Sequence, residues 1–350
     1  MSGGKTVLVT GGAGFIGSNY CRYVLEKHPD YRVVVLDALT YAGNLSTLVD
    51  IENNPANTGR FRFYPGKIQD ETVVNGIMKA ENINYIVNFA AESHNDRSIL
   101  EPGSFIQTDV YGVFTLLDAT RRHKVERMVQ IGTDEAYGTI DHGQFTENHP
   151  LEPNTPYSAS KAGGDLQVRA HFITYKTPAL ITRCGNNFGP FQYPEKLIPF
   201  FVTRLMDNKK VPLYGDGQQV RDWVYVMDHC AGIDTVLHQG TLGEAYNIGS
   251  EGELPNIEIV NRLLKLLDKP ESLVKRIADP RGGAHDKRYS IDATKLRALG
   301  WRPTHDFETA LEQTVRWYVD NEAWWREIVA SPDYQAFVRR FYGPYLGEDL

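Results

Sequence analysis

Two adjacent acidic residues, Asp134 and Glu135, follow Thr133 where the largely apolar run RMVQIG (127–132) ends. Charged side chains are seldom placed beside such a run for packing reasons. Two carboxyl groups that their surroundings hold in different protonation states can serve as the acid and the base of one reaction. TDEAYG is therefore a candidate acid–base site, although a strand-end TDE can also simply cap the next turn.

A second reactive pair, Tyr157 and Lys161, lies in the stretch YSASK. On a helix, positions i and i+4 share one face, so we expect the ammonium near the phenol, lowering the tyrosine pKa from about 10. A phenolate can take the proton of a sugar hydroxyl while the carbon gives hydride to a nicotinamide. YxxxK also occurs by chance on helix surfaces, but here it follows EPNTP, a loop that should begin a helix.

A glycine-rich turn stands between the first predicted strand and helix, in VLVTGGAGFIGSN. Gly11 would permit the tight turn, and Gly14 would let the backbone approach a pyrophosphate. Gly17 would allow the helix to pack closely against the strand. Asp37 ends the next strand, where a carboxylate can bind the adenosine ribose. No arginine follows in ALTYAGN, which favours NAD over NADP. Tight turns and caps use the same residues, but the order of strand, turn, helix, strand and Asp favours a dinucleotide site.

The elements that must position these residues alternate along the first half of the chain. Helical patterns separate short apolar runs that read as strands, and such unalternating runs indicate a parallel sheet buried on both faces. We therefore predict an α/β fold, a Rossmann-type doubly wound parallel sheet, with residues 1–185 binding NAD and carrying the catalytic residues. A smaller, loop-rich part, 186–350, should bind substrate and interleave with the first. The predicted strands are 6–10, 32–37, 61–66, 85–91 and 127–132.

Composition narrows the class of protein. The chain has 350 residues, of which 41% are hydrophobic and 23% charged, as in ordinary globular proteins. Its net charge of −7 does not indicate a surface that binds nucleic acid. Three widely spaced cysteines without a CxxC argue against disulfides or a metal site. No stretch approaches the length of apolar sequence that a membrane helix needs. We expect a cytoplasmic protein without metal, and an aromatic tail that packs on the body or on a partner.

These residues together resemble the extended short-chain dehydrogenase/reductase family, which includes sugar-nucleotide epimerases, decarboxylases and dehydratases. The resemblance runs from about residue 5 to about residue 320. Its dTDP-glucose 4,6-dehydratases are similar in VTGGAGFIGSN, LDALTYAGNL, AAESHNDRSI, TDEAYG, YSASK, NNFGPFQYPEKLIP and GDGQQVRDWVYVMDH. Epimerases and decarboxylases usually carry serines in place of Thr-Asp-Glu.

The resemblance implies a hydro-lyase acting on a dTDP- or UDP-hexose. NAD oxidises C4, water leaves across C5 and C6, and hydride returns to C6. By similarity Asp134 is the acid, Glu135 the C5 base, and Thr133 a hydrogen-bonding partner of the C4 oxygen beside Tyr157. The relatives commonly dimerise, so a homodimer is expected on resemblance alone.

The resemblance also places the binding residues. For the cofactor these are Gly11, Gly14, Phe15, Ile16, Gly17, Asp37, Leu39, Thr40, Tyr41, Asn44, Ile68, Ala90, Ala91, Glu92, Thr108, Tyr157, Lys161 and Asn187. For the substrate they are Ser93, Thr133, Asn186, Lys196, Leu197, Arg221, Asn256 and His285, with Arg221 on a nucleotide phosphate. Asp96 and Arg97 are expected to form an ion pair.

Four positions depart from the family pattern. Lys67 stands where an Asp binds the adenine, Asp109 where Asn is expected, and Asn95 where Val is expected. The loop DPRGGAHDKRY carries a Gly-Gly-Ala spacer before His285 in place of a proline-containing turn, so thymine and uracil both stay open.

Two alternative functions remain at this point. An NAD-dependent sugar-nucleotide epimerase or decarboxylase would share the glycine turn and YxxxK, and the Asp-Glu pair disfavours it. A non-catalytic relative that binds NAD or a nucleotide sugar would need no such set of reactive residues.

Overall fold

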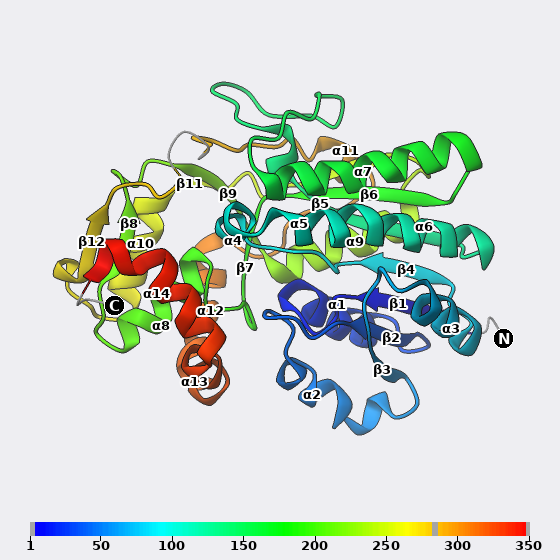
Figure 1. The fold of residues 1–350 in the computed structure, drawn as a ribbon, viewed down its shortest axis with the longest axis horizontal. Coiled ribbons are helices and arrows are strands. Elements are labelled where there is room, and N and C mark those ends of the chain that lie inside the picture. The colour runs from blue at the N-terminus through cyan, green and yellow to red at the C-terminus, as the bar shows by residue number, and fades with distance from the viewer. Residues whose placement is uncertain (1–3, 282–285, 348–350) are drawn as a thin grey trace.

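The larger part of the protein is a seven-stranded parallel sheet in the order β10-β6-β5-β4-β1-β2-β3 (Figure 1). The computed structural model describes residues 4–281 and 286–347. The strands are β1 Thr6–Thr10, β2 Arg32–Asp37, β3 Phe61–Pro65, β4 Tyr85–Asn88, β5 Arg127–Thr133, β6 Ala179–Cys184 and β10 Ala245–Ile248. The predicted Rossmann-type fold is confirmed.

Helices cover both faces of this sheet, which explains why its strands are apolar without alternation. In β1, Val7 and Val9 join the core under α1 (Phe15–Lys27) and α9 (Val226–Gln239). Leu8 points to the opposite face. That face is covered by α3 Glu71–Glu81, α6 Val113–Arg122 and α7 Pro156–Tyr175.

All five predicted strands are present, and the helix expected after EPNTP begins at Pro156. Its cap is reciprocal: Thr155 and Ser158 each bind the other's backbone N–H through the side chain. The sequence analysis missed β6 and β10. Their pairing to β5 and to each other is a long-range property, and both carry polar residues that interrupt the apolar signal.

The smaller part lies at one end of the sheet, on the left in Figure 1. It contains a three-stranded sheet of β7 Asn186–Phe188, β9 Val220–Tyr225 and β11 Glu253–Pro255, and a parallel pair of β8 Val211–Tyr214 and β12 Val274–Ile277. Its helices are α8 Leu197–Met206, α10 Asn256–Leu266, α12 Phe307–Asp320, α13 Glu322–Ala330 and α14 Pro332–Leu346. Among the described residues, the short α-helices are α2 Val49–Glu52, α4 Asn95–Leu100, α5 Pro102–Phe105 and α11 Thr294–Ala298.

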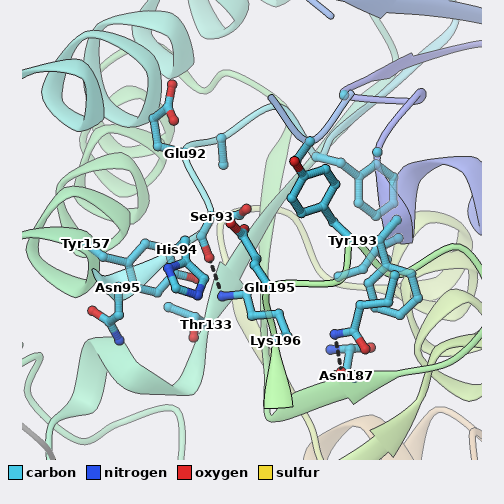
Figure 2. A pocket seen from close by; sticks show the side chains of 18 of the residues that line it. Glu92, Ser93, His94, Asn95, Thr133, Tyr157, Asn187, Tyr193, Glu195 and Lys196 are labelled. Carbon is cyan, nitrogen blue, oxygen red and sulfur yellow. Dashed lines mark hydrogen bonds between the residues drawn. The ribbon is translucent and has the colours of Figure 1, made fainter. Parts of the chain in front are cut away.

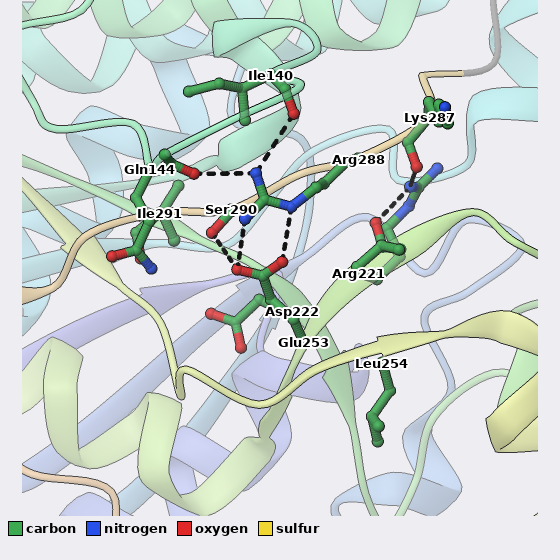
Figure 3. A network of polar contacts seen from close by, with 12 residues as sticks. Ile140, Gln144, Arg221, Asp222, Glu253, Leu254, Lys287, Arg288, Ser290 and Ile291 are labelled. Atoms are coloured by element: carbon green, nitrogen blue, oxygen red, sulfur yellow. Dashed lines mark hydrogen bonds and ion pairs between the residues drawn. The ribbon is translucent and has the colours of Figure 1, made fainter.

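A polar network fixes the segment that follows the undescribed residues 282–285 (Figure 3). The Arg288 guanidinium donates to both oxygens of Glu253 at 2.7 and 2.8 Å, and Ser290 donates to the same carboxylate. Arg221 donates to the carbonyls of Asp286 and Lys287 at 2.8 and 3.4 Å. The segment is thereby held against β9 and β11, at the side of the site described next.

Within 4–281 and 286–347, the helices are too short or too polar to cross a membrane.

Candidate active site

A cavity of about 630 Å³ lies at the carboxyl ends of the parallel strands, where ligands of such sheets bind. Both parts of the chain line it (Figure 2). Of the predicted site residues that the structure describes, all but Leu39, Tyr41 and Asn44 line this cavity. His285 lies outside the described residues.

The three glycines of the first turn differ in what they do for the fold. Gly11 has φ +68°, and a Cβ there would lie 2.6 Å from the Ala90 nitrogen. A Cβ on Gly17 would lie 2.3 Å from the Gly11 carbonyl oxygen. On Gly14 it would meet only that oxygen, at 3.3 Å. The fold therefore demands glycine at 11 and 17, whereas the open space beside Gly14 fits the approach of a phosphate.

Asp37 ends β2 and is buried at the rim of the same turn. Its carboxylate accepts the Ala13 and Leu39 N–H groups at 2.9 and 2.7 Å, so it also fixes the loop that follows. Burial raises the pKa of Asp37, and these two hydrogen bonds oppose that rise. Each oxygen keeps a further lone pair, which fits the acceptance of ribose hydroxyls.

The three predicted residues that do not line the cavity brace its wall. Leu39 supplies one N–H to Asp37, and the Asn44 N–H donates to the Ala13 carbonyl at 3.1 Å. The Tyr41 hydroxyl lies 3.1 Å from Ser93 Oγ.

The acidic pair sits where β5 ends. Thr133 caps a single helical turn, Asp134–Tyr137, by accepting the Glu135 N–H at 3.2 Å. Asp134 is 1% exposed, and its Oδ2 has no hydrogen-bond partner among the described residues. Burial, and then the charges of Glu135 and Asp222, raise the pKa of Asp134 well above its ordinary value. Thr133 therefore does cap this turn, and the burial of the neighbouring Asp134 carboxyl favours its neutral form, which can donate a proton.

The YxxxK pair lines the cavity from α7, but not with the predicted electrostatics. The Lys161 ammonium donates to the Ile131 carbonyl at 2.6 Å. Burial and the charges of Glu135 and Asp109 raise the pKa of Tyr157 well above 10. The expectation of a lowered pKa is wrong for the protein alone, because desolvation and the carboxylates of Glu135, Asp109 and Asp134 all raise it. A positive charge bound in the cavity would favour the phenolate.

Asp109 lies directly behind this pair and is 1% exposed. One carboxylate oxygen accepts Ser160 Oγ at 2.6 Å and the other accepts the Glu92 N–H at 3.0 Å. Burial raises the pKa of Asp109 to about 6, against the nearby charge of Lys161. It therefore links the YxxxK helix to the loop after β4.

Two positive groups, Lys196 and Arg221, also line the cavity. The Lys196 ammonium donates to the Ser93 carbonyl at 2.6 Å, as Figure 2 shows, and burial lowers the pKa of Lys196. Arg221 is 5% exposed and its guanidinium lies 4.3 Å from the centre of the Tyr289 ring. Asn186 and Asn256 also line the cavity.

The expected Asp96–Arg97 ion pair is wrong. Asp96 binds Arg281 at 2.6 Å, and Arg97 binds Glu195 at 3.1 Å. Adjacent residues near the start of a helix point in different directions, so each charge pairs with a segment distant in the sequence.

Sequence reasoning missed several lining residues from distant segments. His229 holds the Asn187 side chain at 2.8 Å, and burial lowers the pKa of His229 to about 3, so it stays neutral. Tyr342, from the aromatic tail, reaches the cavity beside Tyr214, with 3.1 Å between the hydroxyls. The helical tail could be predicted, but its place against the cavity could not, since nothing local encodes it.

A separate group of possible metal ligands lies between α1 and α9. It consists of His28, Asp234 and His238. Asp234 accepts from His28 at 3.0 Å and lies 3.3 Å from His238. Hydrogen bonding accounts for this arrangement.

Comparison with known proteins gives one consistent result. Residues 8–314 match the family model described as GDP-mannose 4,6 dehydratase. The low-salt glycan biosynthesis protein Agl12 of Haloferax volcanii is 49% identical, over 90% of this chain and 99% of the relative. A dTDP-glucose 4,6-dehydratase of Xanthomonas campestris is 47% identical, over 91% and 94%. The structure of the Streptomyces venezuelae dTDP-glucose 4,6-dehydratase DesIV with NAD bound is 48% identical, covers 92% and 99%, and has a TM-score of 0.88.

The glycine turn generates a first prediction. Gly17→Ala should lower the melting temperature of the NAD-free protein, because its Cβ overlaps backbone. Gly14→Ala should melt near the parent yet bind NAD at least about tenfold more weakly, since a methyl group occupies the phosphate approach. Scanning calorimetry and titration calorimetry measure the two effects. Unchanged NAD affinity in Gly14→Ala would place the pyrophosphate elsewhere.

Asp109 generates a second prediction, which concerns the pH dependence of stability. Its folded pKa lies above the unfolded value of 3.8, so the folded state holds the proton and stability falls as pH rises through about 6. Asp109→Asn removes this loss: its Oδ1 can accept the Glu92 N–H, and its Nδ2 can donate to Ser160 Oγ while that hydroxyl donates to the Tyr157 carbonyl. At pH 7.5 we expect the free energy of unfolding of Asp109→Asn to exceed that of the parent by about 1–3 kcal/mol. Near pH 4 this difference should vanish. Denaturant unfolding at the two pH values checks this, and a constant difference would contradict it.

Proposed function

Since the chain belongs to the family described as GDP-mannose 4,6-dehydratases, with an extended short-chain dehydrogenase/reductase fold, we propose that it acts as an NAD-dependent nucleotide-sugar 4,6-dehydratase. It is a hydro-lyase that converts dTDP-glucose, or a UDP-hexose, to the 4-keto-6-deoxy sugar. One observation supports this activity independently of the fold. A buried carboxyl kept neutral, Asp134, stands next to Glu135 in the cavity that holds Tyr157 and Lys161.

The turn at Gly11, Gly14 and Gly17, the Asp37 carboxylate and the strand-end loops fit NAD, as the space beside Gly14 indicates. When bound, NAD accepts hydride from C4 of the hexose and returns it to C6. We assign NAD to residues 1–185 and the sugar nucleotide mainly to 186–350.

Tyr157 takes the proton of the C4 hydroxyl through its phenol oxygen. Thr133 lies beside it and binds the same substrate oxygen. Lys161 and the positive charge of the bound cofactor favour the phenolate against the burial that otherwise holds the proton. The residues thereby set the conditions for oxidation at C4, which acidifies the C5 proton.

The two carboxyl groups have different roles in the elimination of water. Glu135 takes the proton from C5, and Asp134, already protonated by its burial, gives its proton to the C6 hydroxyl as that group leaves as water. An epimerase needs neither transfer, so the pair supports the dehydratase over that alternative.

Arg221 and Lys196 offer positive charge to the diphosphate of the substrate, with Asn186, Leu197 and Asn256 beside them. The comparison with dTDP-glucose dehydratases supports a thymine nucleotide. We also propose a cytoplasmic homodimer. The cytoplasm is a reducing compartment, and the three buried cysteines, which form no disulfide bond, are compatible with it.

The carboxyl pair yields the test. Glu135→Gln keeps size but cannot accept the C5 proton, so both C5 exchange and product formation should fall about 10²- to 10⁴-fold. Asp134→Asn should slow product formation similarly while C5 exchange is less affected, because exchange does not require the C6 oxygen to leave. Deuterium incorporation at C5, measured beside product formation, separates the two steps.

Tyr157→Phe is the matched control, because it should abolish exchange and product alike while the protein still folds. The dehydratase proposal fails if wild type makes no 4-keto-6-deoxy sugar, or if both carboxyl variants turn over at the parental rate.

A further inference from the structure

Asn95 makes a contact that the proposed chemistry has not used. It is the first residue of α4, directly after the loop that follows β4, and is 6% exposed. Its side-chain nitrogen donates a hydrogen bond to Oε2 of Glu135. Asn95 thereby joins the loop after β4 to the turn after β5. Figure 2 shows it at the same end of the cavity as Tyr157 and Thr133.

The other half of the Asn95 amide is unsatisfied. Its Oδ1 is buried, with no hydrogen-bond partner in 4–281 or 286–347. The amide cannot turn over to improve this, because Oδ1 would then face the Glu135 carboxylate. Burying an unpaired carbonyl costs free energy, so packing alone would favour an apolar residue such as the Val expected by resemblance. A contribution at Glu135 would explain why a polar residue is kept here.

Charged groups face Glu135 from several elements. Lys196, before α8, Arg221 on β9 and Arg281, after β12, bring positive charge toward it. Asp134, Tyr157 and Tyr289 also lie near Glu135. Among the described residues, it is the Asn95 side chain that donates a hydrogen bond directly to the Glu135 carboxylate.

We propose that Asn95 is a positioning residue for Glu135, holding its carboxylate oriented toward the substrate. The inference rests on the proposed function, in which Glu135 removes the C5 proton. The hydrogen bond that Asn95 donates fixes one carboxylate oxygen of Glu135, and one fixed oxygen limits the rotation of the other. Asn95 itself touches no reacting atom in this role.

The experiment compares Asn95→Leu, which keeps the size and removes the amide, with the parent. C5 deuterium exchange is followed from pH 5 to pH 9. A donor to a charged group typically contributes about 10- to 100-fold, so exchange at pH 7 should fall by that factor. KM should change little, because Asn95 orients the base and is not assigned to substrate binding. A second variant, Asn95→Asp, removes the donor and places a like charge beside Glu135, so exchange should fall at least as far.

Ser98→Ala is the matched structural control. The Ser98 hydroxyl donates to the Asn95 carbonyl at 2.7 Å within the same short helix, and Ser98 does not line the cavity. Its loss loosens α4 without touching Glu135. We expect the control to keep the parental pH profile even where it melts lower.

A carbon-13 spectrum of the Glu135 side chain in the substrate-free protein gives a readout independent of turnover. The Glu135 carboxyl signal should move in Asn95→Leu, because the hydrogen bond that Asn95 donates to it is lost. Superimposable spectra and rates would overturn the proposal. It would also be overturned by a rise in KM alone, or by Ser98→Ala reproducing the Asn95→Leu loss of exchange. Failure of the proposed function looks different: wild type then lacks C5 exchange altogether, while the spectrum still decides the role of Asn95.

Discussion

Burial of carboxyl groups at the strand ends is the constraint on which the rest of this site depends. Asp109, Asp134 and Asp222 are each 1% exposed and lie within or directly behind the cavity region, and burial raises the pKa of all three. An isolated buried carboxylate is too costly to keep, so each must be hydrogen-bonded or protonated. Asp222 takes the first solution, accepting the Ser250 and Gly252 N–H groups. Asp134, with Oδ2 unpartnered, takes the second.

This constraint explains why the two parts of the chain cannot be separated in function. The Asp134 carboxyl belongs to the end of β5, but Asp222 and Arg221, which act on its pKa in opposite directions, belong to β9. β9 in turn holds the segment after residue 285 through Arg221 and through β11 (Figure 3). A disturbance of that distant segment would therefore reach Asp134, the proposed acid, through Arg221 and β9, without touching the TDE stretch.

Local sequence predicted those features whose cause is local. The glycine turn, Asp37, the first five strands and the start of α7 depend on residues within one strand–turn–helix unit, and each is found where expected. Features set by distant pairing were missed or wrong. Asp96 and Arg97 bind Arg281 and Glu195, and Tyr342 enters the cavity from the tail. The pKa of Tyr157 was misjudged because spacing gives the position of one ammonium, but not the desolvation by every neighbouring element.

The departures from the family pattern gain meaning from the same physics. Two of them, Asn95 and Asp109, contact the acid–base groups or the helix that carries them, and both are buried. At an exposed position either exchange would be close to neutral. Inside a region where the charged form of any acid is penalised, a donated hydrogen bond or an added carboxyl changes the balance between neighbouring protonation states. The roles proposed for Asp134 and Glu135 thus depend on the whole buried cluster, including residues outside the motif.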